Sequence, residues 1–228
     1  MKNALRILGK GLRNYWAQGF PLMLMNVVTV LLAAPVITLP PALAGLWNVG
    51  NQVADGKPAQ WRDYSAGFRT YFSRSWGLAL VHLLGFGITL VNVWIYVSGN
   101  QPFNVSEQIG SWLFLFFAVL GFVWFAYQMY PLALLLEQTD QRLRVAWRNG
   151  VVLFMVQPGF TIGLSLLLFL IIAVSMVLPP LWLLATLAVL AVVCNQAVKY
   201  LLEPHREQLR AKEAEGASLE EGGTESHG

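Results

Sequence analysis

Four long runs without a single charged residue constrain this chain more than any other feature. They cover residues 76–97, 109–136, 158–178 and 181–198. A helix needs about 20 apolar residues to cross the roughly 30 Å hydrocarbon core of a bilayer. The runs therefore predict membrane-spanning helices, and they place the chain in the class of all-α, multi-pass membrane proteins.

The distribution of charge supports the same class. The 228 residues include 15 Lys and Arg and 12 Asp and Glu, and ten of these charges fall in the last 26 residues. The remaining 17 charges are too few for a soluble domain of 202 residues, which normally carries about a quarter of its residues as charges. A soluble enzyme is thereby excluded. Residues 203–228 are rich in Gly, Glu and Ser at their end and predict an acidic, disordered cytoplasmic tail.

The first apolar region, residues 20–50, is interrupted by Pro35 and by the pair Pro40 and Pro41. Proline interrupts helical hydrogen bonding, so this region is either one kinked span or a hairpin of two. Lys and Arg accumulate on the cytoplasmic side of membrane proteins. The hairpin places all 15 basic residues on one side, whereas the single span divides them 11 to 4.

We therefore predict a helical bundle of six membrane segments in the cytoplasmic membrane, with both termini cytoplasmic. The segments are 20–39, 41–54, 76–97, 109–136, 158–178 and 181–202. The second has only 14 residues, or about 21 Å of helix, so whether it crosses fully stays open. At its depth Asn48 needs a partner within the protein.

Two stretches outside the spans have the periodicity of amphipathic helices, at residues 2–16 and 59–75. In the first, Leu5, Leu8, Leu12, Tyr15 and Trp16 lie opposite four basic residues. Such helices lie in the headgroup layer and attract anionic lipid, although both could equally pack on the bundle as ordinary helices. The predicted membrane-interface anchors are Tyr15, Trp16, Trp61, Arg62, Tyr64, Phe68, Arg69, Arg74 and Trp76.

A third, shorter stretch at residues 139–150 turns Leu143, Ala146 and Trp147 to one side. Each of the three stretches precedes a pair of predicted membrane segments. This order suggests a threefold plan in which an interfacial elbow helix leads into two membrane helices.

Several short motifs resemble the YesL-like family of bacterial integral membrane proteins, a domain-of-unknown-function group. The resemblance covers residues 10–202 and rests on Pro40-Pro41-Ala42-Leu43-Ala44-Gly45-Leu46-Trp47, Trp61-Arg62-Asp63-Tyr64, Gly67-Phe68-Arg69, Tyr130-Pro131-Leu132 and Ala146-Trp147-Arg148-Asn149. Members of that family are often encoded near sugar-uptake transporters. The resemblance therefore implies a role beside carbohydrate uptake, and it supplies no catalytic residues.

Polar residues inside the predicted spans are the candidate functional groups, because burying them in a membrane is costly. His82 lies six residues into the third segment and could relay protons or, as a neutral imidazole, bond a neighbouring helix. The amides could join helices or line a cavity for a neutral polar solute such as a sugar. The full set of buried polar candidates is Asn26, His82, Asn92, Gln128, Asn195 and Gln196.

Motifs of soluble enzymes, such as a phosphate-binding glycine loop or a metalloprotease His-Glu-x-x-His, are absent from the sequence. We therefore expect a non-enzymatic accessory or scaffold protein without a cofactor or metal. Its expected partners are anionic lipid headgroups and a transporter or other membrane protein, and no nucleic acid. The alternative is a small facilitator or carrier for an uncharged polar solute.

Overall fold

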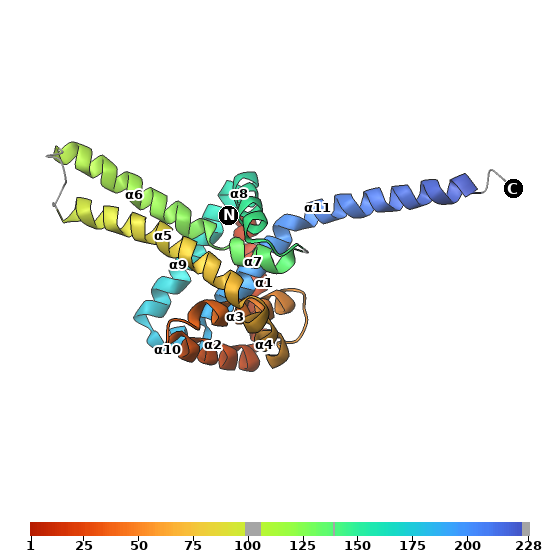
Figure 1. Ribbon diagram of the computed structural model, residues 1–228, viewed down its shortest axis with the longest axis horizontal. Helices are drawn as coiled ribbons and strands as arrows, with labels where there is room; N and C mark the ends of the chain where they lie inside the picture. The colour runs from red at the N-terminus through yellow and green to blue at the C-terminus, as the bar shows by residue number, and fades with distance from the viewer. Residues whose placement is uncertain (99–105, 139, 225–228) are drawn as a thin grey trace.

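The structure is a computed structural model that describes residues 1–98, 106–138 and 140–224, with side chains as far as Gln208. Every regular element of these residues is a helix (Figure 1), which confirms the all-α prediction. The predicted outer loop at 98–108 falls mostly on residues 99–105, outside the described part. The elements are α1 (Lys2–Ala17), α2 (Gly19–Ala33), α3 (Leu39–Ala54), α4 (Trp61–Thr70), α5 (Phe72–Val97), α6 (Glu107–Tyr127), α7 (Pro131–Glu137), α8 (Leu143–Val156), α9 (Pro158–Val177), α10 (Pro179–Leu181), η2 (Trp182–Thr186) and α11 (Leu187–Thr224).

Several of these helices could span a membrane. Four stretches are long and apolar enough: Phe72–Val97, Glu107–Glu137, Pro158–Val177 and Pro179–Gln208. The pair α1 and α2, bent by 94° at their junction, makes a fifth candidate. The chain is thus consistent with a multi-pass membrane protein. The length of the helices does not support the predicted count of six membrane segments, because α2 has only 15 residues and α3 only 16.

The short helix α3 is central to the bundle, with eleven of its 16 residues buried. Two glycines allow its neighbours to come close. A Cβ added at Gly45 would lie 2.8 Å from the carbonyl oxygen of Tyr64 on α4. A Cβ added at Gly50 would lie 2.8 Å from the carbonyl carbon of Ala191 on α11. Small side chains therefore let α3 pack tightly between α4 and α11.

The hairpin of α5 and α6 has a different environment. It projects from the bundle (Figure 1), and only 11% of the apolar window of each helix is buried. The two helices contact each other, for example through the stacked rings of Tyr96 and Phe117 with centroids 6.0 Å apart. Their outer faces carry large exposed apolar side chains, among them Leu83, Leu90, Trp94 and Trp112.

The C-terminal region differs from its prediction as a disordered tail. α11 continues as a helix to Thr224 and extends away from the bundle (Figure 1). The reason lies in composition, because residues 206–215 are almost entirely Arg, Glu, Gln, Leu, Ala and Lys, which are strong helix formers. Low apolar content prevents this segment from forming a core, but it does not prevent a single helix.

Candidate functional site

Two of the predicted membrane-interface anchors face the bundle. Tyr64 is 5% exposed, and its hydroxyl lies 2.9 Å from the Thr29 hydroxyl. Burial raises the pKa of Tyr64, so the phenol stays neutral. Tyr15 is 6% exposed and donates to the carbonyl of Leu184 at 3.4 Å. Both hydroxyls bond within the protein, so these two side chains pack on the bundle, which is the alternative that the sequence left open.

The other predicted anchors keep some exposure. Trp16 is 77% exposed and Trp61 is 47% exposed, whereas Phe68 and Trp76 are half-buried. Arg62 and Arg69 lie on the exposed face of α4. Arg74 donates from Nη1 to Oε1 of Gln141 at 2.6 Å and so joins the start of α5 to the segment before α8.

Helix α1 presents three faces. Ala4, Ile7, Gly11 and Tyr15 are buried. Leu5 and Trp16, which the periodicity placed on the same face as Tyr15, are exposed. The third face is basic, with Lys2, Arg6, Lys10 and Arg13 all exposed. α1 therefore packs on the bundle and also keeps an apolar stripe beside a basic one.

Asn26 completes the backbone hydrogen bonding of the π-helical turn η2. It is fully buried and donates from Nδ2 to the carbonyls of Trp182 at 3.0 Å and Leu183 at 2.6 Å. Its Oδ1 accepts from the backbone amide of Ala188 at 2.8 Å. Irregular turns leave backbone groups without their usual partners, and one amide side chain satisfies three of them here. Asn26 is thus bonded to the protein and not directed at a cavity.

The other amides on α3 and α11 also bond within the protein. Asn48 donates to the carbonyl of Asp63 at 2.8 Å, which provides the partner that its depth requires. Asn195 donates to the carbonyls of Trp47 at 3.1 Å and Ala191 at 2.8 Å. Gln196 accepts from Asn14 at 3.3 Å. These side chains join α1, α3, α4 and α11.

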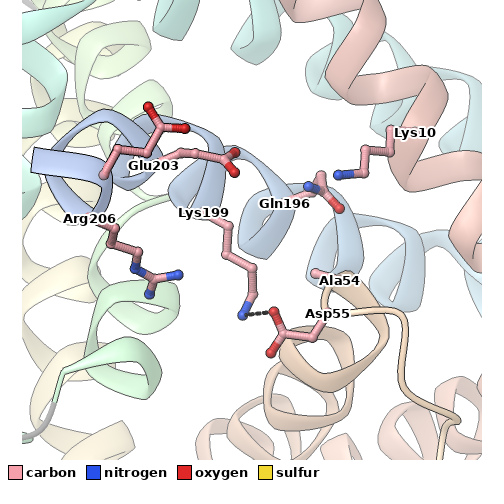
Figure 2. Close-up of a pocket in the computed structure, with 8 residues that line it drawn as sticks. Lys10, Ala54, Asp55, Gln196, Lys199, Glu203 and Arg206 are labelled. Atoms are coloured by element: carbon pink, nitrogen blue, oxygen red, sulfur yellow. Dashed lines mark hydrogen bonds and ion pairs between the residues drawn. The ribbon is translucent and has the colours of Figure 1, made fainter. Parts of the chain in front are cut away.

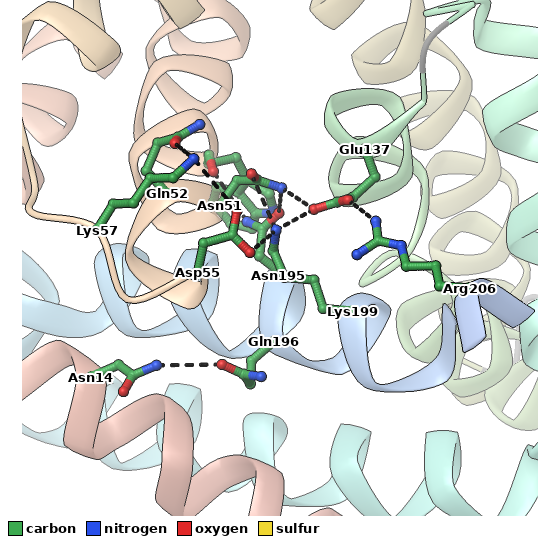
Figure 3. Close-up of polar contacts among 11 residues, drawn as sticks. Asn14, Asn51, Gln52, Asp55, Lys57, Glu137, Asn195, Gln196, Lys199 and Arg206 are labelled. Carbon is green, nitrogen blue, oxygen red and sulfur yellow. Dashed lines mark hydrogen bonds and ion pairs between the residues drawn. The ribbon is translucent and has the colours of Figure 1, made fainter. Parts of the chain in front are cut away.

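A cluster of paired charges joins α3, α7 and α11 (Figure 3). Glu137 at the end of α7 bonds both Lys199 and Arg206 of α11. Asn51 of α3 donates to the Glu137 carboxylate at 2.7 Å. Lys199 also contacts Asp55 at 2.7 Å. The side chains of Glu137 and Lys199 are only 9% and 10% exposed, so this ionic cluster holds charges that are largely buried.

A cavity of about 170 Å³ opens beside the ionic cluster (Figure 2). Its lining holds three basic residues, Lys10, Lys199 and Arg206, and three acidic ones, Asp55, Glu203 and Glu207. Because three basic and three acidic residues line it, the cavity carries no net charge that would favour an anion or a cation. The ionic cluster is suited to holding helices together.

His82 lies among aromatic rings. Its ring centroid is 5.4 Å from that of Trp147 and 6.1 Å from that of Trp124. Its Nδ1 atom is buried without a hydrogen-bond partner among the described residues. The predicted hydrogen bond from His82 to a neighbouring helix is therefore not formed through Nδ1. A proton relay, the other possibility that the sequence left open, would also need a hydrogen-bond partner for this atom, and none of the described residues provides it.

Gln128 lies between two adjoining cavities. One, of about 140 Å³, is lined by His82, Gln128 and Ser75 together with apolar residues of α3, α5 and α7. The other, of about 290 Å³, is lined by Gln128, Ser165 and Cys194 among apolar residues. Trp47 also lines both cavities. The structure thus brings His82 and Gln128 together, whereas Asn92 bonds the Ile88 carbonyl of its own helix at 2.7 Å and lines neither cavity.

Sequence reasoning missed the ionic cluster and Ser165. Glu137 and Lys199 were recognisable only as charges at the ends of separate apolar runs. Two opposite charges at the ends of two spans on the same predicted side of the membrane indicate a possible ion pair. The spacing of the two residues along the chain, however, does not show that they are in contact. No group of His, Cys, Asp and Glu in the described residues could hold a metal ion.

No protein-family model, curated protein or solved structure matches the chain. The resemblance to YesL-like proteins therefore depends on the quoted motifs alone.

Proposed function

We propose that the chain is a non-enzymatic, multi-pass membrane protein with an accessory or scaffold role. The observation that carries this proposal is the α5–α6 hairpin. It projects from the bundle with 11% of each apolar window buried, so most of its surface is available to lipid and to the spans of another protein. The apolar face of a membrane helix packs against lipid or against the helices of another membrane protein.

The polar groups of the bundle support the same role. Asn26, Asn195 and the ionic cluster are engaged in hydrogen bonds and ion pairs between helices. Ion-coupled carriers use ionisable groups within the membrane as working sites, whereas here the buried charges pair with one another. A bundle held in this way suits a scaffold that presents the hairpin in a constant position.

The proposal includes a bacterial cytoplasmic membrane, anionic headgroups beside the basic faces of α1 and α4, and membership of the YesL-like family. The link to carbohydrate uptake depends on that resemblance alone. We propose a transporter or other membrane protein as the partner of the hairpin.

One hydrogen bond helps to decide how many times the chain crosses the membrane. The indole nitrogen of Trp76 donates to the carbonyl of Ile37 at 3.1 Å. The six-segment arrangement places the turn after α2 outside and the start of α5 inside, about 30 Å apart. We therefore favour four crossings by α5, α6, α9 and α11, with both termini cytoplasmic and α2–α3 as a hairpin that does not cross twice. This arrangement also keeps all 15 basic residues on one side.

Cysteine labelling distinguishes the two topologies. Val36, in the turn between α2 and α3, is 64% exposed, and the native Cys194 is buried. A membrane-impermeant maleimide added outside intact cells should label Ser98→Cys but not Val36→Cys. Labelling of Val36→Cys from outside would instead establish the six-segment arrangement.

Photo-crosslinking in native membranes tests the accessory role. A photoreactive residue at Leu90, which is 63% exposed on the hairpin, should give a protein adduct of discrete mass. The same residue at Leu31, which is 64% exposed on α2, is the matched control and should not give that adduct. Adducts to lipid alone from Leu90 would contradict the proposal.

A second candidate function is a facilitator for an uncharged polar solute. It is supported by the two cavities that meet at Gln128, where buried polar atoms of His82, Gln128 and Ser165 have no partner among the described residues. Liposomes containing the purified protein decide between the candidates. Saturable uptake of a sugar above that of empty liposomes would favour the facilitator, and its absence is the expected result.

A further inference from the structure

The two cavities that meet at Gln128 form a candidate binding site, which we call the paired cavity. Gln128 and Trp47 belong to both linings, so together they form the partition. The smaller cavity adds His82 from α5, and the larger one adds Ser165 from α9. Residues of α3, α5, α6, α7, α9 and α11 thus line the two adjoining cavities.

Three polar atoms of this lining lack a partner. They are Nδ1 of His82, Nε2 of Gln128 and Oγ of Ser165, each buried without a hydrogen bond among the described residues. Ser165 is itself only 1% exposed. Buried polar groups in folded proteins are almost always hydrogen-bonded, so these atoms indicate a molecule that supplies donors or acceptors.

Apart from Ser75, whose hydroxyl donates to the Phe72 carbonyl at 2.8 Å, the rest of the lining is largely apolar. Leu78 and Leu132 contribute to the smaller cavity, and Phe125, Leu168 and Leu190 contribute to the larger one. No charged residue lines either cavity, which disfavours an ion. A free sugar is also disfavoured, because it carries more hydroxyl groups than the three unpartnered atoms can satisfy, and buried hydroxyls without partners are costly.

We infer that the paired cavity binds a small, neutral amphipathic molecule: an apolar body that carries one or two hydroxyl or carbonyl groups. The polar end bonds Gln128 and Ser165, and the apolar body lies against the aromatic and aliphatic lining. Ligand sites of this composition, mostly apolar with a few convergent polar groups, are the common type. The inference is independent of the accessory role, because binding is measured here without transport.

Equilibrium dialysis of the full-length protein in lipid nanodiscs tests whether the paired cavity binds such a molecule. Empty nanodiscs measure the amount of probe that partitions into the lipid, and this amount is subtracted. The probes are 2-naphthol, naphthalene and glucose. We expect 2-naphthol to saturate at one molecule per chain, and naphthalene to bind roughly tenfold more weakly because it lacks the hydrogen-bonding group. We expect glucose not to bind saturably.

Variants assign the binding to the paired cavity. Gln128→Leu should lower the affinity for 2-naphthol to that for naphthalene, while Gln108→Leu, at an exposed position of α6, should leave it unchanged. Ser165→Ala is the second variant, should Gln128→Leu fail to fold, and should weaken 2-naphthol severalfold without affecting naphthalene. No saturable binding above empty nanodiscs, which would mean that the cavity holds only water, would overturn the inference. So would saturable binding of glucose, or unchanged 2-naphthol affinity in both cavity variants.

Discussion

The bundle around α3 and α11 and the α5–α6 hairpin are both helical and apolar, yet they are stabilised differently. In the bundle, glycines bring backbones together at Gly45 and Gly50, and buried polar groups such as Asn26 and Lys199 bond across helices. In the hairpin, apolar side chains such as Leu90 and Trp94 point outward. The difference teaches that hydropathy identifies helices suited to a membrane but does not say which of them face it.

The largest expected effect comes from the ionic cluster. Lys199→Met leaves the buried Glu137 carboxylate with less compensation, so we expect the free energy of unfolding to fall by about 3–5 kcal/mol. Thermal or SDS unfolding of the detergent-solubilised protein, followed by circular dichroism, measures it.

Lys57→Met is the matched control for this change. Its side chain is 61% exposed and lies 4.0 Å from Asp55, so we expect a change of less than about 1 kcal/mol. Adding Glu137→Gln to Lys199→Met should recover part of the loss, since it removes the buried carboxylate that Arg206 alone compensates. Equal losses of stability in Lys199→Met and Lys57→Met would contradict the claim that the ionic cluster stabilises the bundle.

A smaller effect is expected at η2. Asn26→Leu removes the side chain that bonds two carbonyls and one amide of the π-helical turn. Leaving such groups unpaired costs about 1–3 kcal/mol each before relaxation, so we expect a total loss of about 3 kcal/mol. The same unfolding measurement applies.

The control for Asn26 lies on the hairpin. Asn92→Leu makes the same chemical change, but its amide bonds only the Ile88 carbonyl of its own helix, whose backbone bond persists. We expect stability to be nearly unchanged. A loss as large as that of Asn26→Leu would mean that the two regions do not differ in how they use polar groups.

The smallest expected effect concerns backbone approach. Gly50→Ala forces a methyl group against the α11 backbone, and overpacking typically costs about 1–3 kcal/mol. Gly87→Ala on α5 meets nothing within 4 Å and should stabilise its helix by roughly 0.5–1 kcal/mol. Changes of opposite sign in the free energy of unfolding of the two variants would support the difference between the bundle and the hairpin. Changes of the same sign would contradict it.

Sequence patterns were sufficient for the helical class, for the four long apolar stretches and for the amphipathic helices α1 and α4. They were insufficient where distant residues meet. Periodicity placed Tyr15 and Tyr64 on apolar faces without showing what those faces contact, and the structure adds the contacts with Leu184 and Thr29. Asn26 and Ala188 are 162 positions apart, and no spacing rule connects them.

The second predicted segment illustrates the same limit. Its 14 residues suggested a marginal span, whereas its glycines make α3 a central helix with eleven buried residues. The signal was present in the small residues at positions 42, 44, 45 and 50, but its meaning depends on what α4 and α11 bring against them. Composition likewise suggested disorder after residue 203, where helix propensity was the better guide.

Spin-label accessibility tests the central claim most directly, namely that the hairpin faces the membrane interior while the polar faces of the bundle helices do not. Labels at Leu90 on α5 and at Ser65 on the exposed face of α4 are compared in nanodiscs. The account predicts that Leu90 is accessible to oxygen and protected from a water-soluble nickel chelate, with the reverse at Ser65. High accessibility of Leu90 to the nickel chelate would contradict it.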